Sequence, residues 1–156
     1  MQAQSRKRSR RASFRRRGRP VCRGVRGATT VEGTSRELIL TATAELLERM
    51  VQANGIETED IASAIFTTSP DLTAEYPALA ARLMGWRDVA LLCGHEMAVP
   101  GGLDRCVRIL LHWNTMAAAS EIEHVYIHGA ANLRPDREEL DELRRQIEAR
   151  QERSSD

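Results

Sequence analysis

Residues 106–114, CVRILLHWN, are the clearest guide to the fold class because apolar and polar side chains alternate along them. One side of the segment is apolar and consists of Val107, Ile109, Leu111 and Trp113. The other side carries Arg108 and His112. A period of two is typical of a β-strand, whose successive side chains point to opposite faces of a sheet. We therefore predict a strand with two unlike faces.

Four other segments are rich in β-branched and apolar residues and also predict strands: residues 21–27, 61–68, 89–93 and 124–132. Gly27 is expected to end the first of them, and residues 28–33 are expected to form a loop. The Gly101-Gly102 pair predicts a turn shortly before residues 106–114.

A helix is expected between the first two of these strands. Residues 34–37, TSRE, fit a capping box, in which the Thr34 oxygen accepts a hydrogen bond from a free backbone amide and Glu37 reaches back. The helix should run to about residue 53 and stop at the Asn-Gly pair that ends with Gly55. Its apolar stripe falls at helical spacing: Leu38, Ile39, Ala42, Leu46, Met50 and Val51.

Pro77 suits the first turn of a second helix, which should run to about Met84 and end at Gly85. Residues 137–150 are highly charged and predict a marginal helix or a mobile tail. Their apolar positions again fall at helical spacing: Leu140, Leu143 and Ile147. The element order is strand, helix, strand, helix and then strands, which is an α+β pattern.

The 156 residues suit one domain, and no apolar run approaches the ~18 residues that a membrane-spanning helix needs. Nine of the 23 basic side chains lie in residues 1–20 without an acidic one, which leaves 14 basic against 22 acidic side chains in residues 21–156. We expect residues 1–20 to be a disordered, dispensable extension, because they have too few apolar side chains to fold. Two alternatives are an arm that touches nucleic acid or anionic surfaces and a twin-arginine signal, although no hydrophobic stretch follows the arginines.

The spacing of the cysteines and histidines matches few known kinds of reactive or metal-binding site. Three cysteines form no CxxC pair, so we expect reduced thiols in a cytoplasmic protein. The four histidines lack the spacing of a metal site, and we expect no metal. Cys93 and His95 could share a strand face as a nucleophile and its base, which is an alternative for a hydrolase. No P-loop, GxGxxG or GxSxG motif occurs.

Isolated arginines are the most suggestive chemical feature. Arg108 lies among Val, Ile and Leu, where a guanidinium needs an anionic partner or costs several kcal/mol. Arg23 and Arg26 lie in the first predicted strand, Arg82 on the second helix and Arg134 after the last strand. Each of these could pair with one of the chain's own acidic side chains. The residues by themselves indicate only a small domain suited to an anionic ligand, because arginine binds carboxylates with two parallel hydrogen bonds.

A series of short sequence words carries a family resemblance. The words are RGVRGATTV at 23–31, PDL at 70–72, YPA at 76–78, AAR at 80–82, CGHEM at 93–97, GGL at 101–103, CVR at 106–108, HVY at 124–126 and LRPD at 133–136. In this order and spacing they resemble the Bacillus-type (AroH-class) chorismate mutases over about residues 21–136. Residues 137–156 fall outside the resemblance. Leu79 and Leu92 depart from it, since some members carry a lysine and a threonine at these places.

The resemblance implies an α+β fold, with a mixed β-sheet packed against helices and three chains assembled into a pseudo-barrel. It implies a Claisen rearrangement of chorismate to prephenate, in aromatic amino-acid biosynthesis, with no cofactor. The active sites then lie at the subunit interfaces of a homotrimer. Two other hypotheses stay open: a catalytically silent trimer that binds a small carboxylate, and a nucleic-acid-binding protein that acts through residues 1–20.

The resemblance also implies roles for individual residues. Arg108 is expected to stabilise negative charge on the ether oxygen of chorismate. Arg26 is expected to grip the side-chain carboxylate, with Tyr126 beside it. Glu96 and the backbone around Cys93 are expected to hold the ring hydroxyl. Arg108, Arg26 and Glu96 are thus the expected catalytic residues, and the other two are expected to bind the substrate.

The remaining matched residues are expected around the rim of the site. Tyr76 and Arg82 should close it from a neighbouring subunit, and Ala78 should also bind the substrate. Leu133 and Arg134 should form its mobile C-terminal edge.

Overall fold

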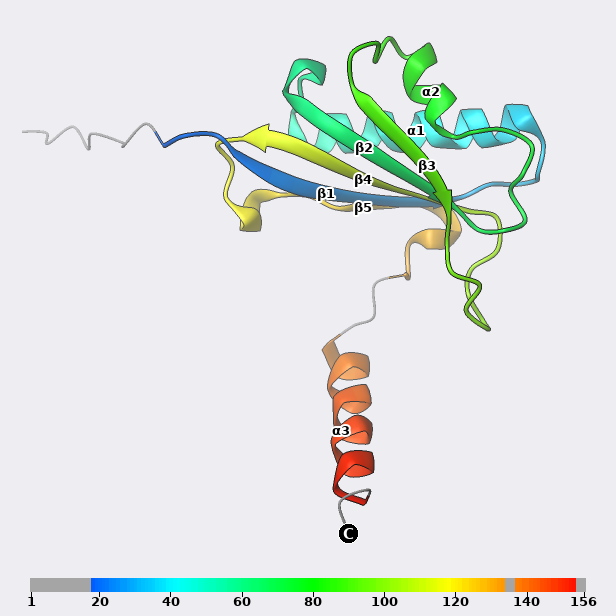
Figure 1. Ribbon diagram of the computed structural model, residues 1–156, viewed down its shortest axis with the longest axis vertical. Helices are drawn as coiled ribbons and strands as arrows, with labels where there is room; N and C mark the ends of the chain where they lie inside the picture. Colours follow the sequence, from blue (N-terminus) through cyan, green and yellow to red (C-terminus); the bar gives the residue numbers. More distant parts are fainter. Residues whose placement is uncertain (1–17, 134–136, 154–156) are drawn as a thin grey trace, which may run out of the picture.

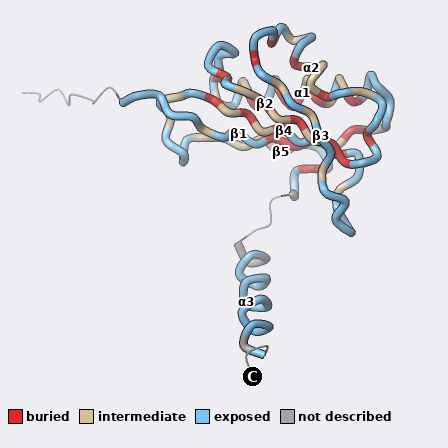
Figure 2. The backbone as a smooth tube through the Cα atoms, viewed as in Figure 1, coloured by how far each residue is buried: buried red, intermediate tan, exposed pale blue. Residues whose placement is uncertain are grey.

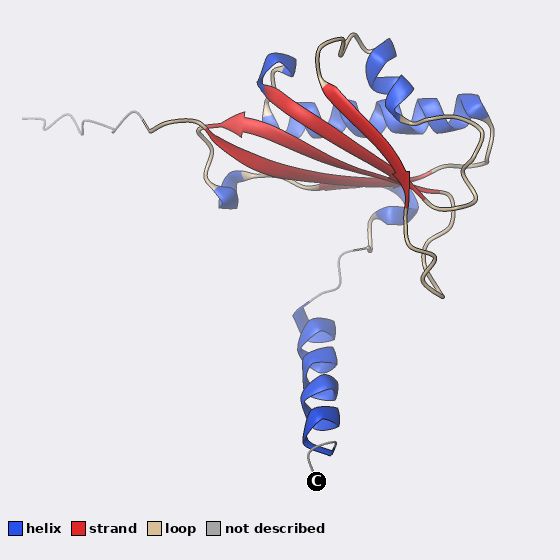
Figure 3. Cartoon of the chain, viewed as in Figure 1, coloured by secondary structure: helices blue, strands red, loops and turns tan. Residues whose placement is uncertain are grey.

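A computed structural model of the chain describes residues 18–133 and 137–153 (Figure 1). Most of the extension predicted for residues 1–20 lies outside the described residues. The body is a five-stranded sheet with two helices, α1 (Arg36–Asn54) and α2 (Ala78–Leu83), packed on one side of it (Figure 3). The predicted α+β fold class is therefore confirmed.

The strands in chain order are β1 (Val21–Thr30), β2 (Ile61–Thr68), β3 (Ala90–His95), β4 (Cys106–Thr115) and β5 (Val125–Tyr126). Their order across the sheet is β3-β2-β4-β1-β5. The central strand β4 is antiparallel to both β1 and β2, whereas the pairs β2–β3 and β1–β5 are parallel. The sheet is thus mixed, as the family resemblance implied.

The first strand is longer than its sequence suggested. The loop predicted for residues 28–33 is wrong in its first half, because β1 continues to Thr30. Gly27 does not end the strand but pairs with Ile109. A Cβ atom at Gly27 would come within 2.3 Å of Met50 Sδ on α1. The glycine is therefore required by the close approach of the helix and not by a turn.

Helix α1 begins one residue later than the predicted capping box implied. Ser35 caps it in place of Thr34, and the Ser35 Oγ accepts a hydrogen bond from Leu38 N at 3.3 Å. Gly55 ends the helix in the left-handed conformation, with φ of 63° and its N–H bonded to Val51 O, as expected. The buried face of α1 consists of Ile39, Thr43, Leu46, Leu47 and Met50. Leu38 was expected in this stripe but remains 40% exposed.

The strand predicted for residues 124–132 shrinks to the two residues of β5. His128 takes a left-handed φ of 53°, and the chain enters the 3₁₀ turn η3 (His128–Ala130). Gly129 N donates a hydrogen bond to Thr30 Oγ1 at 2.9 Å, which ties this turn to the end of β1. The turn depends on a contact with a distant strand, which local residue preferences could not show.

Strand β4 has the two unlike faces that its alternation predicted. Figure 2 shows buried residues along the strands of the sheet and exposed residues along α3. Val107, Ile109 and Leu111 are at most 2% exposed and belong to the core beneath α1. Arg108 and Leu110 project from the opposite face, which α1 and α2 leave uncovered. We call this second side of the sheet the open face.

The charged C-terminal segment forms a helix, α3 (Arg137–Arg153), which is one of the two alternatives of the prediction. It stands apart from the sheet in Figure 1. Its apolar residues are about half exposed: Leu140 51%, Leu143 53% and Ile147 49%. Among the described residues, no helix is long and apolar enough to cross a membrane.

Candidate active site

Cross-strand pairing gathers several of the predicted site residues on the open face. One row of paired residues crosses all five strands and consists of Tyr126, Ala28, Arg108, Thr67 and Gly94. Residues that are paired directly across strands project their side chains to the same face of a sheet. Tyr126 and Arg108 therefore point to the open face, with β1 between them.

A second row lies one step along the same face. It consists of Arg26, Leu110, Ile65 and Leu92, contributed by β1, β4, β2 and β3. Arg26 is two residues before Ala28 on β1, so both side chains lie on the same side of that strand. Two guanidinium groups, from adjacent strands, thus share the open face.

A pocket of about 360 Å³, which we call the arginine pocket, lies over these two rows. Half of the predicted site residues line it: Arg26, Glu96, Arg108, Tyr126 and Leu133. Ile65 and Leu110 add apolar surface to its lining. Two guanidinium groups against one carboxylate give the pocket a surplus of positive charge, which favours an anionic ligand.

The anionic partner that Arg108 was expected to need is Glu96. Arg108 Nε lies 3.5 Å from Glu96 Oε1, and the two side chains are 44% and 32% exposed. The sequence placed Arg108 amid Val, Ile and Leu. Val107 and Ile109 project into the core, whereas Leu110 lies on the open face with Arg108. An ion pair this exposed contributes little to stability.

Thr67 is a site residue that the sequence prediction missed. Its Oγ1 donates a hydrogen bond to Glu96 Oε1, the same oxygen that faces Arg108. The backbone amide of Glu96 also bonds to Thr68 O at 2.8 Å, which fixes the start of the chain after β3. The alternation along β2 could have indicated that Thr67 lies on an uncovered face, but not that this face carries Arg108.

Tyr76 and Cys93 lie elsewhere, in a second pocket of about 430 Å³ that we call the edge pocket. Cys93 pairs with Phe66, which is fully buried, so both side chains point to the helix-covered side of the sheet. The backbone N–H of Ala78, at the start of α2, lies close enough to the Cys93 thiol to influence its pKa. Within one chain, Tyr76, Ala78 and Cys93 are therefore on the side of the sheet opposite Arg108.

The edge pocket does not support the Cys/His nucleophile. Burial raises the pKa of the Cys93 thiol, which disfavours the reactive thiolate. His95 Nδ1 lies 3.0 Å from Thr68 Oγ1 and shares a hydrogen bond with that hydroxyl. All three cysteines of the chain are free. In the described part of the chain, no group of three or more His, Cys, Asp or Glu side chains is arranged to hold a metal ion.

Arg82 lines neither of these two pockets. The Arg82 guanidinium donates hydrogen bonds to the carbonyls of Trp86 and Arg87, the latter at 2.9 Å, and so supports the end of α2. Arg134 lies outside the described residues.

The sequence profile of the family described as "Chorismate mutase type I" matches residues 22–137. The chain belongs to this family of chorismate mutases.

Individual relatives agree with the family assignment. The chorismate mutase AroH of Thermus thermophilus is 49% identical over 119 residues, which are 76% of this chain and 98% of that protein. The chorismate mutase AroH of Bacillus subtilis (strain 168) is 43% identical over 117 residues, which are 74% of this chain and 92% of that protein. A solved chorismate mutase from Clostridium thermocellum matches with a TM-score of 0.68 and 47% identity, over 69% of this chain and 96% of that one. The resemblance predicted from short words is thereby confirmed.

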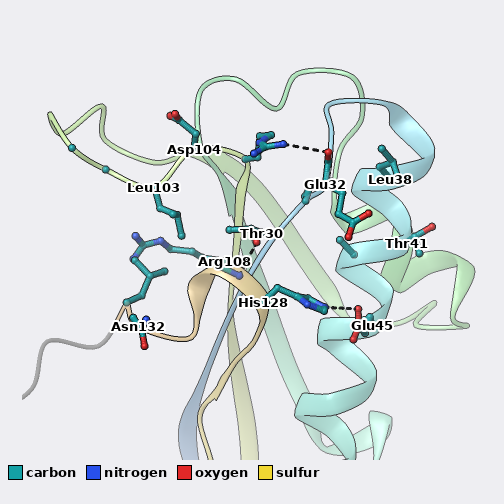
Figure 4. A pocket seen from close by; sticks show the side chains of 17 residues that line it. Thr30, Glu32, Leu38, Thr41, Glu45, Leu103, Asp104, Arg108, His128 and Asn132 are labelled. Carbon is teal, nitrogen blue, oxygen red and sulfur yellow. Dashed lines mark hydrogen bonds and ion pairs between the residues drawn. The ribbon is translucent and has the colours of Figure 1, made fainter.

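In this chorismate mutase fold, a larger depression of about 1020 Å³ adjoins the arginine pocket (Figure 4). Arg108 and Leu133 line both hollows. Thr41 and Glu45 of α1 form one wall of the larger depression, and His128 lies opposite them. The chain segment that carries Tyr126 and Leu133 thus lies between the two.

Hydrogen bonds anchor residues 124–128 of the chorismate mutase body at both ends. His124 Nδ1 accepts a hydrogen bond from Arg26 N at 3.1 Å. His128 Nε2 lies 3.0 Å from Glu45 Oε2, as the dashed line in Figure 4 shows. The hydrogen bond with His128, assisted by one from Arg49, lowers the pKa of the Glu45 carboxyl. The segment is therefore held to β1 at one end and to α1 at the other.

Proposed function

We propose that the protein catalyses the rearrangement of chorismate to prephenate, a step of aromatic amino-acid biosynthesis. The observation that carries the proposal is the presence of Arg26 and Arg108 in one pocket with Glu96 and Tyr126. Chorismate carries two carboxylates, so a pocket with two guanidinium groups matches its charge. The family and the named relatives support the same activity.

Arg108 is suited to stabilise the transition state. In the rearrangement an ether C–O bond breaks while a C–C bond forms within the same molecule, and negative charge builds on the ether oxygen. A fixed cation beside this oxygen binds the transition state more tightly than the substrate, which is the condition for acceleration. Arginine suffices because the reaction moves no proton, and a guanidinium cannot act as an acid or base near neutral pH.

The other residues of the arginine pocket are suited to hold the substrate in its reactive shape. Arg26 pairs with the side-chain carboxylate, and Tyr126 lies beside it. Glu96 accepts a hydrogen bond from the ring hydroxyl, and Leu133 covers the pocket from the C-terminal side. Confining a flexible substrate in this way removes part of the entropic cost of the reaction. Every atom of chorismate is retained in prephenate, so the reaction consumes no second substrate.

We further propose that the protein is a homotrimer whose sites lie between subunits. Tyr76, Ala78 and Cys93 lie on the side of the sheet opposite Arg108, so they can reach an arginine pocket only on another copy of the chain. Tyr76 is 74% exposed and Leu92, on the open face, is 64% exposed, which favours a covering partner. Three copies that pair edge pocket to arginine pocket around a threefold axis close the assembly.

The test of the activity is product identification. Purified protein is incubated with chorismate in a chelator, and the products are followed by proton NMR. Prephenate formed well above the spontaneous rate supports the proposal. A folded protein that binds chorismate without converting it would favour the silent carboxylate binder instead.

A further inference from the structure

We propose that Thr67 is a positioning residue that holds the Glu96 carboxylate away from full pairing with Arg108. The inference rests on the proposed function. Thr67 is the direct cross-strand partner of both Arg108 and Gly94, so its side chain projects from the open face between the catalytic arginine and the end of β3. It is therefore placed between Arg108 and the segment that carries Glu96.

The hydrogen bonds around Glu96 show a competition for one oxygen. Thr67 Oγ1 donates to Glu96 Oε1, while Arg108 Nε stands 3.5 Å from the same atom. Charge-assisted bonds between arginine and carboxylate are normally about 2.7–2.9 Å long and often bidentate. The longer separation means that the Glu96 carboxylate is hydrogen-bonded to the Thr67 hydroxyl and is not fully paired with the Arg108 guanidinium.

This arrangement keeps two groups available to the substrate. Among the described residues, Glu96 Oε2 accepts no hydrogen bond, so it remains available to the ring hydroxyl. The guanidinium of Arg108 keeps N–H groups for the ether oxygen, where charge builds in the transition state. Without the Thr67 hydroxyl, the Glu96 carboxylate can turn to form a bidentate pair with Arg108. That pair would occupy the donors of Arg108 and cancel much of its charge.

The first test compares three variants of the full-length protein. Thr67→Val keeps the β-branched shape but removes the donor, Thr67→Ser keeps the donor, and Ser63→Ala is the matched control. Ser63 lies on the same strand and face, where its hydroxyl is 2.9 Å from His112 Nδ1 and away from Glu96. The kcat and KM for chorismate and the melting temperature are measured for each variant.

The proposal predicts a loss confined to kcat. Thr67→Val should lower kcat by about tenfold or more and change KM by less than about threefold, because the lost effect is on a charged group in the transition state. Thr67→Ser should recover most of the loss, and Ser63→Ala should match the wild-type protein. A Thr67→Val kcat within about twofold of wild type would overturn the proposal, as would equal losses in the Val and Ser variants.

A double-mutant cycle tests whether Thr67 acts through Glu96. Glu96→Gln removes the carboxylate, so adding Thr67→Val to it should change kcat by less than about twofold. A further tenfold loss in the double variant would show that Thr67 acts independently, which contradicts the proposal.

An NMR measurement without substrate tests this inference separately from the proposed function. The Nε–H resonance of Arg108, assigned by its absence in Arg108→Lys, is compared between the wild-type protein and Thr67→Val without substrate. A tighter pair with Glu96 should move the resonance downfield in Thr67→Val, and an unchanged resonance would overturn the inference. Wild-type protein that fails to convert chorismate would count against the proposed function alone.

Discussion

Leu110 and Leu111 are neighbours on β4, yet they belong to different surfaces. Leu111 is fully buried beneath α1, whereas Leu110 lies half-buried on the open face in the same row as Arg26. The covered face is apolar because burial requires it, and its composition says nothing about chemistry. The open face tolerates charged residues because water, substrate or another copy of the chain can satisfy them. The contrast locates function on the face that folding leaves free.

Among substitutions on the open face, the loss of the Arg108 guanidinium should have the largest effect on the rate. Arg108→Ala should lower kcat by at least about 10²–10³-fold, the range found for loss of a donor to a developing oxyanion, while the melting temperature stays near that of the wild type. Arg108→Lys should also remain impaired, because lysine lacks the planar fork. The absorbance decay of chorismate measures both rates.

The matched control is Arg145→Ala. Arg145 pairs with Glu142 on α3, away from the sheet, and its loss should leave the rate unchanged. Full activity of Arg108→Ala would remove the proposed role of this residue.

Mixing two inactive variants should restore activity if each site draws on both faces from different chains. Tyr76→Asp places a carboxylate at an exposed position of the edge pocket, where it should repel a dianionic substrate without disturbing the fold. Trimers co-assembled at random from Arg108→Ala and Tyr76→Asp chains should contain intact sites, about a quarter of the total, because each site needs one unaltered group from each of two chains.

The measurement is the rate of the co-expressed mixture against each variant alone. Selecting mixed trimers with two different tags should raise the share of intact sites to about a third, since each mixed trimer contains one intact site. If the rate of the mixture does not exceed the summed rates of the two variants measured alone, the site does not lie between subunits.

Leu111 and Leu110 of β4 should differ in what they stabilise. Leu111 should stabilise the fold of one chain, and Leu110 should stabilise the assembly of chains. Leu111→Ala should lower the free energy of unfolding by about 2–5 kcal/mol, because it leaves a cavity in the core. Leu110→Ala removes the same atoms from the open face and should cost less in unfolding, but it should make activity depend more steeply on protein concentration. Urea titration and a dilution series measure the two effects, and equal unfolding costs would contradict the assignment of the faces.

The smallest expected effect is the pH dependence of the Glu45–His128 contact. The hydrogen bond lowers the pKa of Glu45 in the folded state, so its stabilising contribution is fully present above the ordinary glutamate pKa and is lost as the pH falls through the lowered value. Glu45→Gln should therefore destabilise the protein at neutral pH, by less than about 1 kcal/mol because the pair is well exposed.

Thermal unfolding between pH 3 and pH 7 checks this expectation. The difference between the variant and the wild type should shrink toward the acidic end. A stability difference between the variant and the wild type that grows as the pH falls would contradict the expected role of the Glu45–His128 contact.

Elements with strong local patterns were predicted well from the sequence. Strand β2 begins and ends as predicted, and the alternation along β4 correctly indicated which side chains are buried. The end of α1 at Gly55 was also correct, because a left-handed glycine is a local signal. Each of these depends on interactions between residues close in sequence or on simple burial.

Features that depend on distant contacts were not predictable in this way. Gly27 was taken as a strand end, although its cause is Met50 on a helix packed against it. The turn at His128 depends on Thr30 and Glu45, which are far away in the sequence. The role of Thr67 required knowing which strand is paired with that of Arg108. The site residues themselves came from the family resemblance, since isolated arginines alone did not specify a substrate.

The most direct test of the central claim is a crystal structure of the protein with a stable bicyclic dicarboxylate that mimics the transition state, because such mimics bind the catalytic arrangement tightly. The account predicts that the ether oxygen of the mimic lies within hydrogen-bond distance of Arg108, that one carboxylate contacts Arg26, and that Tyr76 reaches the ligand from a second copy of the chain. A mimic bound away from the open face, or enclosed by one chain alone, would contradict it.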